Sequence, residues 1–148
     1  MSVLQNGVDD GTGMNQTPGS SYAIFPTALQ KIAQMQVRDK QIAFPGLVKD
    51  GTTNGAHQFP IQHILNWVEI RADGDAPSGN PLTVQIVIGG VVQSQVFSLN
   101  AGSQYSSLIA VTSPGLSVNA NTTVAVKLVS GNQASDVVVT LHYQKVIL

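Results

Sequence analysis

Three histidines are the residues of this chain that could most readily do chemistry, because an imidazole can bind a metal or act as a general base. They are His57, His63 and His142. His57 and His63 flank one predicted strand and turn, whereas His142 is expected on the outer face of the last strand. No carboxylate stands at a spacing that suggests a catalytic triad. The three histidines therefore predict no metal site and no catalytic site.

The remaining polar motifs are equally weak. Asp73-Gly74-Asp75 looks like the start of a calcium loop, but Pro77, Ser78 and Val84 occupy positions that such a loop needs for ligands and glycine. No serine lies in a nucleophile-elbow sequence. The chain has no cysteine, which excludes thiol catalysis, disulfides and cysteine-based metal sites. We expect no enzyme activity, no cofactor and no metal.

Four aromatic residues could in principle stack against sugar rings: Tyr22, Trp67, Tyr105 and Tyr143. Trp67 lies within an apolar strand pattern, and Tyr143 is in phase with core residues of the last strand. Large aromatic residues mostly serve a core or an interface. We therefore expect these two in such a place, and a sugar-binding platform remains the alternative.

The elements that must position these residues are β-strands. From Leu82 to Ile88 apolar residues alternate with others, and Gly89-Gly90 leads into a second strand, which predicts a two-residue hairpin. Similar patterns, separated by turn residues, predict the full set of strands: 41–44, 57–62, 64–71, 82–88, 91–99, 105–112, 122–129 and 137–145. About eight short strands are typical of an all-β, jelly-roll-like antiparallel sandwich.

The inward faces of these strands should form one core. The expected core residues are Val68, Ile70, Leu82, Val84, Ile86, Ile88, Val124, Val126, Leu128, Val137, Val139, Leu141 and Tyr143.

The first part of the chain differs from this pattern, so we divide the chain into an N-terminal arm, residues 1–40, and a sandwich domain, residues 41–148. Met1 to Ser21 is rich in polar residues and glycine and cannot bury a core of its own. Pro26 to Val37 has roughly helical spacing, with Thr27 as a plausible N-cap, which predicts a short helix. We expect the arm to lie against another chain. Its candidate apolar contacts are Val3, Leu4, Val8, Met14 and Tyr22.

Charge is scarce and unevenly placed. Only 10% of the 148 residues are charged, against about 25% in ordinary soluble domains, and the net charge is -1. This balance predicts no attraction to nucleic acid or to an anionic membrane, and we expect neither a signal peptide nor a membrane span. No Asp, Glu, Lys or Arg occurs from Ala76 through Val126. Such a β-region is expected to be covered by neighbouring subunits.

The stretch from Gln41 to Tyr143 resembles a β-sandwich domain found in structural proteins of tailed bacteriophages, including capsid decoration, head-fibre and tail-appendage proteins. In the central segment Gln85 replaces the family's usual acidic residue, and Gly89-Gly90 replaces Asn-Gly. The matching segments are Phe44-Pro45-Gly46, Phe59-Pro60 leading into 64–71, Ala76-Pro77-Ser78-Gly79 leading into 82–86, Val124-Ala125-Val126 and 137–141.

The resemblance implies a structural virion protein, and our leading interpretation is a capsid decoration (cement) protein on the surface of the phage head. It would be made in the host cytoplasm, form a homo-oligomer, expected to be a trimer, and contact the major capsid protein. The alternative is a tail or head-fibre module that binds host-surface glycans through exposed loops. An enzyme is disfavoured, because the sequence holds no constellation of catalytic groups.

Overall fold

The structure is a computed structural model that describes residues 4–5, 7–8, 37–112 and 115–146. The chain divides into two compact units, with the boundary between Gln36 and Val37. In the first unit, β1 (Leu4–Gln5) and β2 (Gly7–Val8) form an antiparallel pair, with Leu4 opposite Val8. The second unit contains all the other strands and is called the body below. Within the described ranges there is no helix long and apolar enough to cross a membrane.

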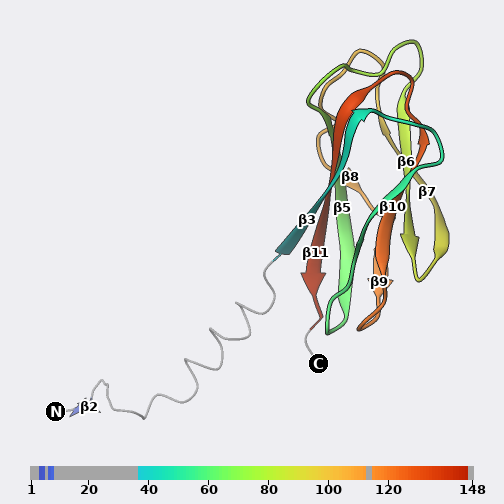
Figure 1. Cartoon of the computed structure of the whole chain (residues 1–148). Coiled ribbons are helices and arrows are strands. Elements are labelled where there is room, and N and C mark those ends of the chain that lie inside the picture. Colours follow the sequence, from blue (N-terminus) through green and yellow to red (C-terminus); the bar gives the residue numbers. More distant parts are fainter. Residues whose placement is uncertain (1–3, 6, 9–36, 113–114, 147–148) are drawn as a thin grey trace. The chain divides into compact units, whose positions relative to one another are not determined.

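The body consists of two antiparallel sheets (Figure 1). One sheet has the strand order β4-β10-β6-β7, and the other has the order β3-β11-β5-β8, with β9 also paired to β5. The strands are β3 (Val37–Leu47), β4 (Thr53–His57), β5 (His63–Ala72), β6 (Leu82–Ile88), β7 (Val91–Leu99), β8 (Ile109–Ala110), β9 (Leu116–Val118), β10 (Val124–Ser130) and β11 (Ser135–Lys145).

The strand pairing is nested. The hairpin β6–β7 is innermost, β5 then pairs with β8 and β9, β4 pairs with β10, and β3 pairs with β11. Further pairing of β5 with β11 and of β6 with β10 joins these hairpins into two sheets. This arrangement, with β8 and β9 counted as one interrupted strand, is the topology of a jelly roll. The predicted fold class is confirmed.

The core lies between the two sheets and is built from the predicted alternating residues. Every expected core residue is buried except Ile88, which packs against the core from a partly buried position near the hairpin turn. Leu82, Val84 and Ile86 on β6 are fully shielded from solvent. Phe97 and Leu99 on β7 complete this side of the core.

The hairpin has the predicted strand bounds and the predicted turn. Gly89 and Gly90 adopt φ angles of 59° and 82°, and Ile88 lies opposite Val91. Positive φ at both central residues is the requirement of a type I′ turn, which glycine meets without a steric cost.

The strand predicted at 57–62 is wrong. The strand is β4, and it ends at His57. Pro60 lacks the N–H that a continued ladder needs, and Phe59 turns into the core instead. Asn54-Gly55, a dipeptide typical of turns, lies inside β4, where Gly55 has a φ of 81° and the register with β10 shifts.

The strand predicted at 105–112 is reduced to β8. Ser107 has a φ of 59°, which breaks the extended conformation between Tyr105 and β8. The Ser106 hydroxyl accepts a hydrogen bond from the Ile70 N–H at 2.8 Å, so a side chain takes the place of a ladder carbonyl on β5. The pairing with β5 resumes further along the chain in β9, which the sequence did not predict.

The helix predicted from Pro26 to Val37 lies outside the described residues, apart from its last residue. Val37 is the first residue of β3 and lies opposite Gln144 on β11, so the helix prediction is wrong at that position. β3 therefore begins upstream of residue 41, where we had placed the start of the sandwich.

Candidate functional site

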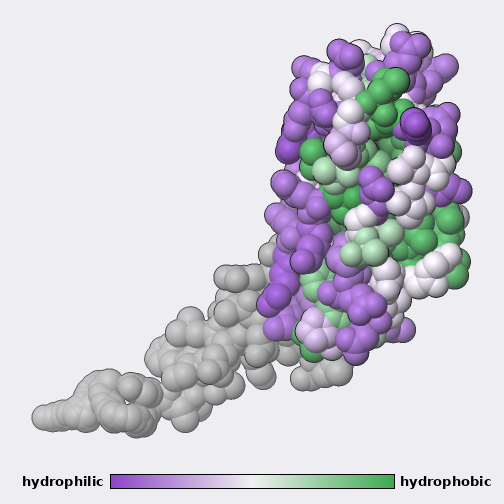
Figure 2. Space-filling view, in the orientation of Figure 1, coloured by the Kyte–Doolittle hydropathy of each residue, from purple (hydrophilic) through white to green (hydrophobic). Residues whose placement is uncertain are grey.

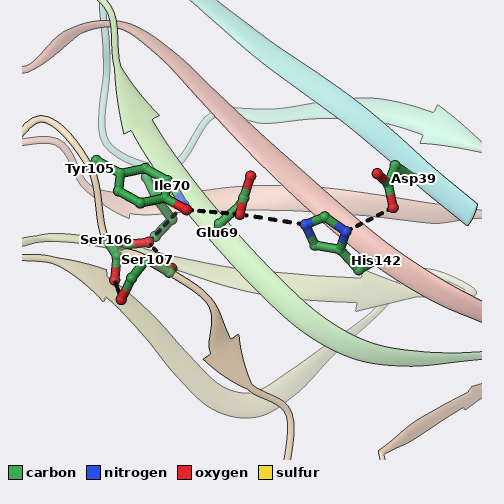
Figure 3. Close-up of polar contacts among 7 residues, drawn as sticks. All are labelled: Asp39, Glu69, Ile70, Tyr105, Ser106, Ser107 and His142. Carbon is green, nitrogen blue, oxygen red and sulfur yellow. Dashed lines mark hydrogen bonds and ion pairs between the residues drawn. The ribbon is translucent and has the colours of Figure 1, made fainter. Parts of the chain in front are cut away.

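A line of polar side chains crosses the outer face of the sheet β3-β11-β5 (Figure 3). His142 on β11 lies between Asp39 on β3 and Glu69 on β5. Its Nδ1 is 2.7 Å from Asp39 Oδ1, and its Nε2 is 3.6 Å from Glu69 Oε2. Because a carboxylate can only accept, the Nδ1 atom donates to Asp39. The predicted outward position of His142 is confirmed.

Tyr105 extends this line beyond β5. Its hydroxyl donates to Glu69 Oε2 at 3.2 Å, and the residue is 55% exposed. Desolvation of the hydroxyl, together with the hydrogen bond to and the charge of Glu69, raises the pKa of Tyr105. The hydroxyl therefore stays protonated and remains a donor at neutral pH.

Trp67 lies beside this network, because it is opposite His142 in the register of β5 and β11. It is 43% exposed and is not part of the core. The reason is a register shift between His142 and Tyr143, which leaves both Asn66 and Trp67 facing outward while Leu65 and Val68 on either side face inward. The tryptophan instead offers an open aromatic surface next to the polar line. Tyr143, in contrast, is fully buried.

This polar-aromatic face combines an indole, a phenol, an imidazole and two carboxylates. The Nδ1 atom of His142 is hydrogen-bonded to Asp39 and so joins β11 to β3, whereas its Nε2 atom faces Glu69 but is buried without a hydrogen-bond partner. In the described ranges, no group of three or more His, Asp or Glu residues is placed to hold a metal ion. The chemistry available at this face is hydrogen bonding and aromatic stacking, which suits a polyhydroxyl ligand or a protein surface.

His57 and His63 belong to a separate aromatic cluster inside the body. His57 ends β4 and His63 begins β5, so the two histidines flank a turn and not the predicted strand. His63 is 1% exposed, and its ring stacks on Phe59 with 3.9 Å between ring centroids. The His57 Nε2 atom lies 2.8 Å from the Tyr143 hydroxyl. The Lys40 ammonium lies 5.7 Å from the centre of the Phe59 ring.

Burial sets the protonation of this cluster. Desolvation is the main cause that lowers the pKa of both His57 and His63. The positive charges of Arg38 and Lys145 lower the pKa of His63 further. The His63 Nδ1 atom is 3.0 Å from the Ile61 carbonyl, whereas its Nε2 atom is buried without a hydrogen-bond partner. A proton on Nε2 would therefore have no acceptor.

This cluster predicts that the body loses stability in acid. Both histidines bind a proton more weakly in the folded state, so stability is fully present above a pH of about 6.5 and falls as the pH drops below that value. Each proton that binds only after unfolding lowers the free energy of unfolding by about 1.4 kcal/mol for each pH unit of acidification. Urea unfolding at pH 7.5 and at pH 5 measures the difference in the free energy of unfolding between the two conditions. His63→Phe, which keeps a stacked ring, should reduce it, and an unchanged pH dependence in that variant would contradict the assignment.

A shallow depression of about 290 Å³ lies where β3 meets β4. Its lining includes Phe44 and Pro45 of the Phe-Pro-Gly segment, together with Leu47, Val48, Lys49, Thr52 and Asn54. Lys49 is the one charged group of this lining, so the depression offers little specific chemistry.

Two of the five candidate contact residues of the arm lie in the described part of the structure. Val3, Met14 and Tyr22 lie outside the described residues. Leu4 and Val8 lie opposite each other in the backbone pairing of β1 and β2.

Comparison with known proteins gives one structural relationship. No protein-family model and no curated protein sequence matches the chain. Among solved structures, the chain matches one from the capsid asymmetric unit of cyanophage Pam1, with a TM-score of 0.52 and 18% sequence identity. The match covers 93% of this chain and 96% of that chain. The likeness is one of fold.

Proposed function

We propose that this chain is a structural protein of a bacteriophage virion, and specifically a capsid decoration protein. The observation that carries the proposal is the fold match to a chain of a phage capsid, which extends over nearly the whole of both chains. An asymmetric unit is the repeating unit of a shell, so a chain within it recurs over the whole capsid. This favours a head component over a tail component.

The proposed work is mechanical. A decoration protein stabilises a shell by burying surface across the junctions between subunits, and each bound copy shifts the equilibrium towards the assembled state. We propose that the protein acts as a homotrimer on the capsid surface and that it contacts the major capsid protein. The scarcity of charge supports a surface that is covered after assembly, because charged residues are depleted from the cores of interfaces.

The arm provides the first test. Deleting residues 1–21 should leave the melting temperature of the body nearly unchanged, because the described body has its own core from β3 to β11. Attachment should weaken, because we propose that the arm reaches across a subunit junction. The measurements are copy number on purified particles and a thermal melt of the free protein. Full occupancy combined with a destabilised body would assign the arm to the fold and leave attachment to the sandwich.

The polar-aromatic face supports a second candidate, a tail or head-fibre module that binds host-surface glycans. Trp67 is exposed beside the line from Asp39 through His142 and Glu69 to Tyr105. An indole next to carboxylates can stack on a sugar ring while the carboxylates accept from its hydroxyls. Trp67 is the only tryptophan of the chain, so a titration of oligosaccharides followed by its fluorescence reads this face directly. Copy number separates the candidates, since hundreds of copies per particle favour a decoration protein.

A further inference from the structure

The uncharged stretch of the sequence forms one side of the sandwich. Residues 76–126 supply β6, β7, β8 and β9, which include the edge strand β7 of one sheet and the interrupted edge β8–β9 of the other. The Gln95 side chain joins these edges, since its Nε2 donates to the Ala110 carbonyl and its Oε1 accepts from the Thr112 N–H, each at 2.9 Å. The two uncharged edges therefore lie side by side. We call this side, β6 to β9, the charge-free flank.

Apolar side chains gather on the outer surface of the β6–β7 hairpin. Val92 lies opposite Val87, and Val96 lies opposite Gln85, so these residues share one face. Val92 and Val96 are 42% and 49% exposed. We call Val87, Val92 and Val96 the valine patch. Figure 2 shows hydrophobic atoms over this hairpin, at the lower right of the body.

The edges of the other sheet are protected in the ways that soluble proteins use. β3 carries Arg38, Asp39 and Lys40, all exposed. The edge beside β8 is closed by Gln95, whose amide pairs with the backbone of Ala110 and Thr112 as a peptide group would. β7 carries no charged side chain and exposes its valines. A monomer that left such a strand open would risk association with other chains.

We infer that the charge-free flank is the surface through which the copies of the proposed trimer meet around its three-fold axis, with the valine patch at the centre of the contact. The argument rests on the absence of charged residues from the flank. An acidic or basic partner would lose water from its own charges and find no counter-charge on the flank. The same flank of a second copy presents a surface without charge, so contact brings no like-charge repulsion. Lys127, opposite Gln85, lies at the border as a polar rim.

The contact is made by side chains and does not extend the sheet. The register of β6 and β7 shifts between Gln85 and Val87, which interrupts the ladder in the middle of β7. A regular strand from a second copy could not follow such an edge along its length. The inference rests on the oligomer proposed above and does not depend on the virion role.

Sedimentation velocity of the full chain over a range of concentrations tests the inference. The variants are Val92→Lys and Val96→Lys, and the control is Ala43→Lys, which adds the same charge at an exposed position on β3. We expect the wild type and the control to self-associate alike and each valine variant to associate at least about tenfold more weakly, since charges are depleted from interface cores. Thermal melts check folding. If a lysine variant fails to fold, the double variant Val92→Thr with Val96→Thr takes its place.

Three results would overturn the inference: a wild type that is monomeric at its highest soluble concentration, valine variants that associate like the wild type, or a control that is equally weakened.

A photo-crosslinking residue at position 96 identifies the protein that contacts the flank on assembled particles. We expect a product between two copies of this chain, and a product with a shell protein instead would assign the flank to the shell. A self-associating protein that fails to bind particles would overturn the decoration role and leave the interface standing.

Discussion

Ile86→Asp is expected to unfold the body, whereas Gln85→Asp at the adjacent position is expected to be mild. Ile86 is fully buried and lies opposite the equally buried Val126 on β10. A carboxylate there has no partner and no water, which costs about 5 kcal/mol. Typical domains have a total stability of about 5–15 kcal/mol. A thermal melt measures this loss. We expect Ile86→Asp to show no cooperative transition, or a larger fall in melting temperature than any surface variant.

The control works because Gln85 faces outward on the same strand. Its side chain donates to the Gln93 carbonyl at 3.2 Å, and it lies opposite Lys127. Gln85→Asp removes this hydrogen bond but places a carboxylate opposite an ammonium group, so a change of about 1 kcal/mol or less is expected. Equal tolerance of the two substitutions would show that the strand faces are assigned the wrong way round.

Gly55→Ala is expected to destabilise the body strongly for a substitution that adds one methyl group. Gly55 has a φ of 81° inside β4, and a Cβ atom there would lie 2.5 Å from Cγ2 of Ile42. Ile42 belongs to the core and is branched at Cβ, so it has little freedom to turn away. Backbone strain and overpacking together should cost about 3 kcal/mol. Urea unfolding of the variant measures this loss.

Gly51→Ala separates the two causes. Gly51 has a similar φ of 85°, but a Cβ atom there would meet nothing within 4 Å. It should therefore show only the backbone cost, about 1 kcal/mol. If both variants lost the same stability, contact with Ile42 would contribute nothing, and the packing of β4 against β3 would need a different account.

The hairpin β6–β7 could be predicted to the residue because its determinants are local. Alternation over a few residues fixes which side chains face the core, and Gly89-Gly90 fixes the turn. The core residues of β10 and β11 follow from the same alternation, and all of them are buried as expected. Here the local signals and the tertiary structure agree, so little further information was needed.

The position of Trp67 in the candidate site was harder to predict, because it depends on an interruption of a regular pattern. Trp67 faces solvent only because two successive residues of β5 point outward at a register shift. Alternation counted back from Val68 would have placed Leu65 outside, yet it is fully buried. Such a shift is set by the partner strand and leaves no mark in the sequence of β5 itself.

The cluster around His63 was missed for a different reason. A histidine at the start of a strand is usually exposed, and nothing in the sequence near His63 marks it as buried. Its environment comes from Phe59 and from Tyr143, which lies on the last strand. The line from Asp39 to Tyr105 likewise joins residues far apart in the chain. Pairings of this kind are defined by the topology, which the local sequence does not encode.

The nested strand pairing has a consequence for how the chain folds. β6 and β7 are adjacent in sequence and can pair early, because closing a short loop costs little entropy. Each following pair must close a longer loop, and the outermost pair joins Val37–Leu47 to Ser135–Lys145. Contacts so distant in sequence make folding slow, on the order of milliseconds to seconds. β3, the first strand of the body, is thus among the last to be fixed.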